Sequence, residues 1–189
     1  MDFKKLFRSF AVLAAVSLVS FSFTSCGDDD EEGGDTPAEG KNPKSAMASY
    51  KFEASQDMID LLDINISYVD KGEIKTEKMT STTWSATAKG EVLPATFGYK
   101  IHMNVKDNAD FSKGSFDFIT RTYSTQYAVY DKKGNRIDEL SQTRSTMTES
   151  KVIGLKEEGV KKVFADKVYF NEGFEIGTDG KFTEKTINW

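Results

Sequence analysis

The sequence is poor in the residues that build covalent and metal frameworks. Its 189 residues include one cysteine, one histidine and three prolines. A single cysteine excludes an internal disulfide and any zinc site built from several thiolates. A single histidine excludes metal sites that need two imidazoles. The length suits one domain, or one domain with a tail.

A basic excess is also lacking, because 25 Lys and Arg stand against 30 Asp and Glu, a net charge of -5. This balance argues against nucleic acid as a partner. The charges are missing altogether from one segment near the N-terminus: Lys4, Lys5 and Arg8 are followed by no charged residue until Asp28. The segment is interrupted by serines and ends in small residues. These features are typical of a secretory signal peptide, here residues 1–25, rather than a membrane-spanning helix.

The only cysteine follows this segment directly. Phe23-Thr24-Ser25-Cys26 resembles the lipobox of bacterial lipoproteins, with Phe23 where leucine is usual. In that family the cysteine thiol carries a diacylglycerol, the signal is cut just before it, and the new amino terminus is acylated too. The resemblance implies lipidation of Cys26, with acyl chains such as palmitate, and a membrane as the partner.

Acidic residues come next, because residues 28–32 are Asp-Asp-Asp-Glu-Glu. The run resembles the export signal that follows the lipidated cysteine in surface-displayed lipoproteins of some Gram-negative bacteria. It implies an outer-membrane location at the cell surface; the alternative is the periplasmic face, with the run acting only as a solvated tether. Residues 26–48 carry little large apolar surface and are predicted to form a disordered stalk. The folded domain is then predicted to span residues 49–189.

The domain alternates between apolar and polar residues, as half-buried antiparallel strands do. The clearest case is residues 95–105, where one side carries Ala95, Phe97, Tyr99, Ile101, Met103 and Val105. Further strands are expected within residues 50–54, 62–69, 74–84, 116–130, 136–148, 168–170, 174–176 and 182–189. Turns with glycine separate several of them, at residues 70–72, 131–135 and 179–180. One short helix is predicted within residues 156–166, from the spacing of Val160, Val163 and Phe164.

The apolar phase changes within residues 116–130. Phe116 and Phe118 lie on one face, whereas Ile119, Tyr123 and Tyr127 lie on the other. This predicts a β-bulge, or a strand shared by two sheets. The fold class is therefore all-β, an antiparallel β-sandwich with at most one short helix, and an immunoglobulin-like arrangement is considered first. The alternative is a lipocalin-like barrel, although no Gly-x-Trp opens the first strand.

The sequence offers no convincing catalytic residue, metal ligand or cofactor site. Nucleophilic catalysis needs a base, and His102 lies in the polar phase of its strand. Glycoside hydrolysis needs two carboxylates across a cleft. With many acids in the domain, Asp57, Asp60 and Asp63, or Glu172 and Glu175, are no evidence of such a pair. Asp107, Asn108 and Asp110 supply oxygen atoms that suit calcium, but a polar turn explains them.

Aromatic side chains are the remaining candidates. Tyr123 and Tyr127 are predicted to share a strand face, and together with Trp84 they form the candidate ligand platform, for glycan or peptide. The same residues also suit a sandwich core. The predicted function is a surface-anchored lipoprotein that presents a non-enzymatic binding or interaction module. It resembles small β-sandwich lipoproteins of uncharacterised function on Gram-negative outer membranes. The alternatives are an assembly partner of an outer-membrane complex and, third, a hydrolase.

Overall fold

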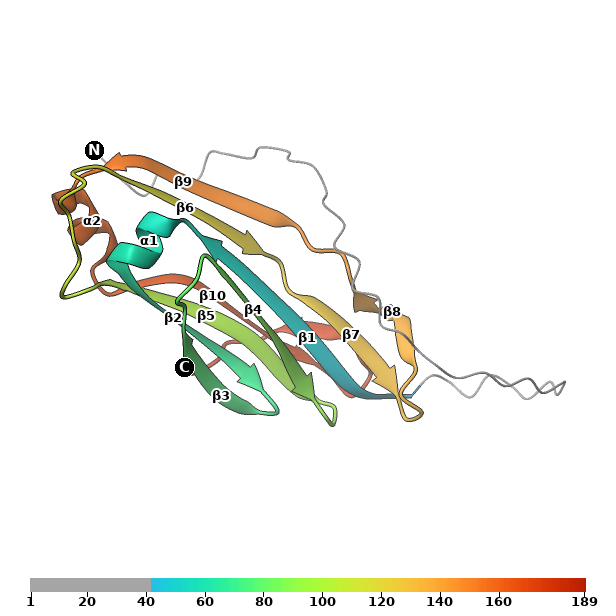
Figure 1. Ribbon diagram of the computed structural model, residues 1–189. Coiled ribbons are helices and arrows are strands. Elements are labelled where there is room, and N and C mark those ends of the chain that lie inside the picture. The colour runs from blue at the N-terminus through green and yellow to red at the C-terminus, as the bar shows by residue number, and fades with distance from the viewer. Residues whose placement is uncertain (1–41) are drawn as a thin grey trace, which may run out of the picture. The chain divides into compact units, whose positions relative to one another are not determined.

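The computed structural model describes residues 42–189, which form two antiparallel β-sheets packed face to face (Figure 1). We call them sheet A and sheet B. The strands of sheet A are β1 (Pro43–Ala54), β4 (Thr83–Gly90), β6 (Phe116–Tyr123), β7 (Gln126–Asp131), β8 (Arg136–Gln142) and β9 (Met147–Leu155). The strands of sheet B are β2 (Leu62–Asp70), β3 (Glu73–Lys78), β5 (Ala95–Val105), β10 (Lys167–Ile176) and β11 (Phe182–Glu184).

The predicted all-β sandwich is confirmed, and the two sheets do not close into the alternative barrel. Sheet B has the order β11-β10-β5-β2-β3. In sheet A, β4 pairs with one edge of β1, while β7 and β6 pair with its other edge. An immunoglobulin domain has its first strand at a sheet edge. The strand order here is different, because β1 is an inner strand.

Strand β1 begins at Pro43, earlier than the domain start predicted at residue 49. The first part of this strand carries small side chains, and Ala46 and Ala48 are fully buried between the sheets. Small residues carry a weak alternation signal, so the segment resembles a polar linker when only its composition is read. The structured domain therefore includes residues 43–48, which the sequence analysis places in the stalk.

Two short helices lie at one end of the sandwich, rather than the single helix predicted (Figure 1). The predicted one is α2 (Glu157–Phe164), which buries Val160 and Phe164. The additional one is α1 (Gln56–Leu61), which joins β1 to β2 and buries Met58, Ile59 and Leu61. A helix of six residues contains fewer than two turns, too few for its periodicity to stand out from neighbouring strands.

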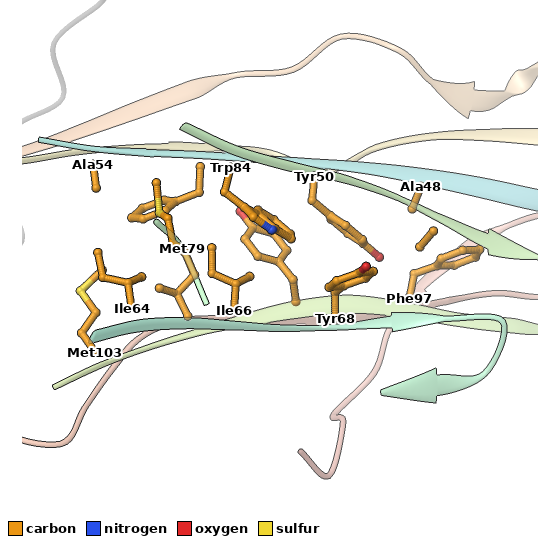
Figure 2. Packing of buried hydrophobic residues seen from close by; sticks show 14 of the residues in the cluster. Ala48, Tyr50, Ala54, Ile64, Ile66, Tyr68, Met79, Trp84, Phe97 and Met103 are labelled. Atoms are coloured by element: carbon orange, nitrogen blue, oxygen red, sulfur yellow. The ribbon is translucent and has the colours of Figure 1, made fainter. Parts of the chain in front are cut away.

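The core lies between the sheets and is rich in aromatic rings. Tyr50 and Trp84 point down from sheet A toward Tyr68 and Phe97 of sheet B (Figure 2). The ring centroids of Tyr50 and Tyr99 are 5.0 Å apart. Other fully buried side chains include Phe52, Ile64, Ile66, Ile101, Met103 and Phe174. These positions alternate along their strands, so the predicted inward faces are correct.

The predicted irregularity within residues 116–130 is present at Ser124 and Thr125. Strands β6 and β7 lie end to end along β1, and β9 and β8 lie end to end beyond them (Figure 1). The register changes by one residue between the two pairs, because Phe52 faces Thr122 whereas Ser49 faces Gln126. One extra residue in a strand reverses the face to which every later side chain points.

The C-terminal residues pack on the outer face of sheet B, where two glycines face each other. Gly98 of β5 is opposite Gly173 of β10. A β-carbon on Gly98 would lie 2.3 Å from the carbonyl oxygen of Glu172 and 2.6 Å from Cδ1 of Ile187. Gly98 also has φ of 152°. Glycine is therefore required here for a close approach of backbone and tail.

Replacing Gly98 with alanine is expected to lower the free energy of unfolding by about 3 kcal/mol, because backbone strain and steric overlap both contribute. Gly114 is the matched control. It has φ of 75°, but a β-carbon there would meet no atom within 4 Å. Gly114→Ala should therefore cost only the backbone strain, about 1 kcal/mol. Urea denaturation measures both losses, and equal losses would contradict the close approach at Gly98.

Candidate functional site

Trp84, one of the three predicted platform residues, lies in the core. Its side chain is 7% exposed, and its ring stacks on Tyr99 with centroids 6.1 Å apart. The indole Nε1 donates a 2.8 Å hydrogen bond to Glu77, and the hydroxyl of Tyr68 donates one of 2.7 Å to the same carboxylate. These two bonds lower the pKa of Glu77. Trp84 therefore helps to close the β3–β4 side of the sandwich and offers no surface to a ligand.

Tyr123 lies on the outer face of sheet A. It sits beside Lys51, whose Nζ is 4.5 Å from the centroid of the tyrosine ring. Its hydroxyl donates a 3.1 Å hydrogen bond to Glu53, which also accepts from Arg121 at 3.3 Å. Burial and this neighbouring carboxylate raise the pKa of Tyr123. The tyrosine thus belongs to a charged network on the surface of the sheet.

Tyr127 lies on the opposite, inner face. It is paired with Ala48, whose side chain is fully buried between the sheets. The prediction that Tyr123 and Tyr127 share a face is wrong, because the extra residue at Ser124–Thr125 lies between them. The three predicted residues are therefore not brought together: one lies in the core, one on the outside, and one in the gap between the sheets.

Tyr127 instead joins two phenylalanines of sheet B. Its ring centroid is 5.7 Å from that of Phe182 and 5.8 Å from that of Phe174, and Phe174 and Phe182 stack at 4.9 Å. Phe174 is fully buried, whereas Phe182 is 41% exposed. The hairpin turn at Asp179-Gly180 signals this arrangement, since it places Phe182 opposite Ile176 and hence on the inner face. Phe182 is the side chain that the sequence analysis missed.

A groove opens beside these rings, between β8 of sheet A and the β10–β11 hairpin of sheet B. Its volume is about 460 Å³. We call it the aromatic groove; it is lined by Tyr127, Glu139, Leu140, Ser141, Gln142, Thr143, Arg144, Gly180, Lys181 and Phe182. The lining combines flat rings with hydrogen-bonding and charged groups of both signs. Small-molecule sites typically have about 300–1,000 Å³ and such a mixture.

A second hollow of about 530 Å³ also has Phe182 in its lining, together with Glu172. Glu172 is paired with the buried Tyr99, so its side chain enters the gap between the sheets. Thr125, between β6 and β7, donates a 2.9 Å hydrogen bond to its carboxylate. Burial raises the pKa of Glu172, and the bond from Thr125 opposes this rise without cancelling it.

The two glutamates considered for hydrolysis point to opposite faces of sheet B. Glu172 faces inward, while Glu175 lies on the outer face and forms an ion pair with Lys185. Asp57 accepts from Lys113 at 2.7 Å and Asp63 from Lys78 at 2.6 Å. These acids make structural contacts within the surface of the domain.

The remaining candidates also make local contacts. His102 is 2.7 Å from the carboxylate of Asp166 on the outer side of sheet B. Asp110, from the loop considered for calcium, accepts a 2.8 Å hydrogen bond from the backbone amide of Ser112, a contact typical of a turn. Residues 42–189 contain no group of three or more His, Cys, Asp or Glu side chains placed to hold a metal ion.

The predicted lipidation site, Cys26, and the acidic residues 28–32 lie outside the described residues. Within residues 42–189, no helix has the length and apolar character needed to cross a bilayer. No protein-family model, no curated protein and no solved structure matches the chain.

The raised pKa of Glu172 predicts a pH-dependent stability. The folded protein holds a proton on Glu172 at pH values where the unfolded chain has lost it, so stability falls as the pH rises through the interval between the two pKa values. Glu172→Gln keeps an oxygen acceptor for Thr125 and carries no charge. This variant should be more stable than the wild type at neutral pH and equally stable below about pH 4.

Chemical denaturation across this pH range provides the measurement. Glu175→Gln is the matched control on the same strand, and it should lose at most about 1 kcal/mol at neutral pH because it breaks a half-exposed ion pair. A Glu172→Gln variant that is less stable than the wild type at neutral pH would show that the carboxylate is ionised and stabilising.

Proposed function

We propose that this chain is a lipoprotein, anchored by lipid on Cys26 at the outer surface of a Gram-negative outer membrane, whose β-sandwich binds a carbohydrate in the aromatic groove. The proposal joins two independent parts, the anchor and the groove. The anchor is inferred from the sequence around Cys26. The binding site is inferred from the contacts among the rings of Tyr127, Phe174 and Phe182. Each part has its own test.

The anchor follows from the position of the cysteine. Cys26 comes directly after an uncharged, apolar segment and directly before a polar one. Each methylene buried in a bilayer contributes about 0.8 kcal/mol, and one acyl chain alone holds a protein only marginally. Three chains, as in the lipoproteins that the motif resembles, bind essentially permanently. The acidic residues 28–32 support the outer surface rather than the periplasmic face as the final location.

The groove supports a saccharide ligand because it offers both kinds of contact that a sugar ring needs. The apolar face of a pyranose packs against flat rings, here Tyr127 and Phe182, and its hydroxyls need donors and acceptors. Ser141, Gln142, Thr143 and Arg144 supply such groups. The observation that favours this site most is that Phe182 stacks on two aromatic neighbours, lines the groove and is still 41% exposed.

Binding is favoured over hydrolysis at this groove. Among the described residues that line it, Glu139 is the single carboxylate. Glycoside hydrolysis uses two carboxyl groups that flank the scissile bond. A binding role needs no such pair, so the lining fits a module that holds its ligand without changing it.

Replacing Cys26 with alanine is expected to abolish acylation and to release the protein from the membrane fraction. Mass spectrometry of the N-terminal peptide of the wild-type protein should find Cys26 modified with lipid and residues 1–25 absent. Ser25→Ala is the matched control, because a small residue before the cysteine preserves the motif. An unmodified thiol at Cys26 in the wild-type protein would contradict the anchor.

Replacing Phe182 with alanine is expected to weaken saccharide binding at least tenfold, which corresponds to about 1.4 kcal/mol. A glycan array identifies the ligand, and calorimetry with the best hit measures affinity. Tyr123→Ala provides the matched control, since it removes an aromatic ring from the outer face of sheet A, away from the groove. An array without hits, or equal affinity for the Phe182 variant and the wild type, would contradict the proposal that the groove binds a saccharide.

A further inference from the structure

Sheet A ends at β9, and no described strand pairs with the outer edge of β9 (Figure 1). A free strand edge presents unpaired backbone donors and acceptors to any other strand. Two large apolar side chains lie on this edge strand: Met147 is 38% exposed and Ile153 is 54% exposed. The edge of sheet B opposite to β11 is different, because β3 is short and carries mostly charged side chains.

Met147, Glu149 and Lys151 are exposed and lie on one face of β9, although Thr148 between them is exposed as well. Met147 is opposite Tyr123, Glu149 opposite Arg121, and Lys151 opposite Ile119, all on the outer face of sheet A. Ile153 is two residues further on and is exposed, where the register with β6 shifts between Val152 and Leu155. The order along this face is therefore apolar, acidic, basic, apolar, and its centre is Ser150.

We propose that β9 pairs antiparallel with β9 of a second copy of this chain, about a two-fold axis through Ser150. Such pairing places Ser150 of one copy opposite Ser150 of the other. Each residue before Ser150 in one copy then lies opposite the residue that is equally far after Ser150 in the other copy. Glu149 then lies opposite Lys151 of the second copy, and Met147 opposite Ile153. The symmetry repeats both contacts, giving two ion pairs and two apolar contacts. Directly opposite side chains have their β-carbons about 4.5–5.5 Å apart, close enough for each contact.

The register is specified by charge. The odd-numbered residues Met147, Glu149 and Lys151 point to the outer face of β9. A two-fold axis perpendicular to the sheet keeps the outer faces of both copies on the same side, so odd-numbered residues must pair with odd-numbered residues. A shift that centres the pairing on Glu149 puts two glutamates opposite each other, and one that centres it on Lys151 does the same with two lysines. Pairing about Ser150 avoids both repulsions and joins opposite charges.

The two charged groups are placed to make this contact. One oxygen of Glu149 is held by Arg121 at 2.9 Å, which positions the carboxylate on the outer face. Lys151 is exposed and has no ion-pair partner among residues 42–189. Lys151 and Glu149 are two residues apart on one face, so their charges are complementary to those of an antiparallel β9 from a second copy. Sheet A then continues through both copies.

A cysteine at the symmetry axis tests the register in the full-length chain. Ser150→Cys places the two thiols opposite each other, within the range of a disulfide. Thr148→Cys is the matched control, because Thr148 lies opposite Val152 and far from Thr148 of the other copy. Oxidation should produce a species of twice the mass on a non-reducing gel for Ser150→Cys only. Equal cross-linking of both variants, or none above the wild-type level, would overturn the proposal.

Charge exchange tests the contact itself. Lys151→Glu alone creates two pairs of facing glutamates, and Glu149→Lys alone creates two pairs of facing lysines, so each should weaken self-association at least tenfold. An equal mixture of the two variants restores both ion pairs and should form a heterodimer, as measured by sedimentation velocity. Lys151→Glu leaves the Arg121 contact intact, and a melting curve verifies its fold. Variants that associate like the wild type, or a mixture that does not associate, would contradict the pairing.

Discussion

The extra residue at Ser124 and Thr125 decides which side chains enter the space between the sheets. Before it, Tyr123 points outward, while its carbonyl oxygen accepts a 3.2 Å bond from the buried Tyr99. After it, Tyr127 and Val129 point inward. Ser124 also forms hydrogen bonds with Ser145 and Thr146. These bonds join the link between β6 and β7 to the link between β8 and β9. Without it, Tyr127 would leave the groove for the outer face.

The two open sides of the sandwich are closed in different ways. On the β3–β4 side, Glu77 accepts hydrogen bonds from Tyr68 and Trp84, and Trp84 is only 7% exposed. On the other side, Phe182 covers the rings of Tyr127 and Phe174 with a strand of only three residues. The aromatic groove forms on this second side because the cover is short. The proposed binding site therefore coincides with the less completely closed side of the core.

The fold could be predicted from sequence because alternation over a strand survives without any tertiary information. Residues 95–105 alternate over their whole length, and β5 has those bounds. The start of β1 could not be predicted, since the small Ala46 and Ala48 fit the core only because larger neighbours fill the space around them. The sequence showed a change of apolar phase after Phe118, but not that the extra residue lies at Ser124–Thr125, and that position decides which tyrosine faces inward. Phe182 could have been found by carrying the hairpin register across Asp179-Gly180.

The inner position of β1 has a mechanical consequence. The chain enters the domain at Pro43, and β1 is bonded along both edges, to β4 over one and to β7 and β6 over the other. Its ladder bonds run perpendicular to the strand. A load applied at this end must shear both ladders together, whereas an edge strand would peel away one residue at a time. Under the proposed anchoring, a force that pulls on a bound ligand is therefore transmitted to the anchor through β1. The hydrogen bonds on both edges of that strand resist it in shear.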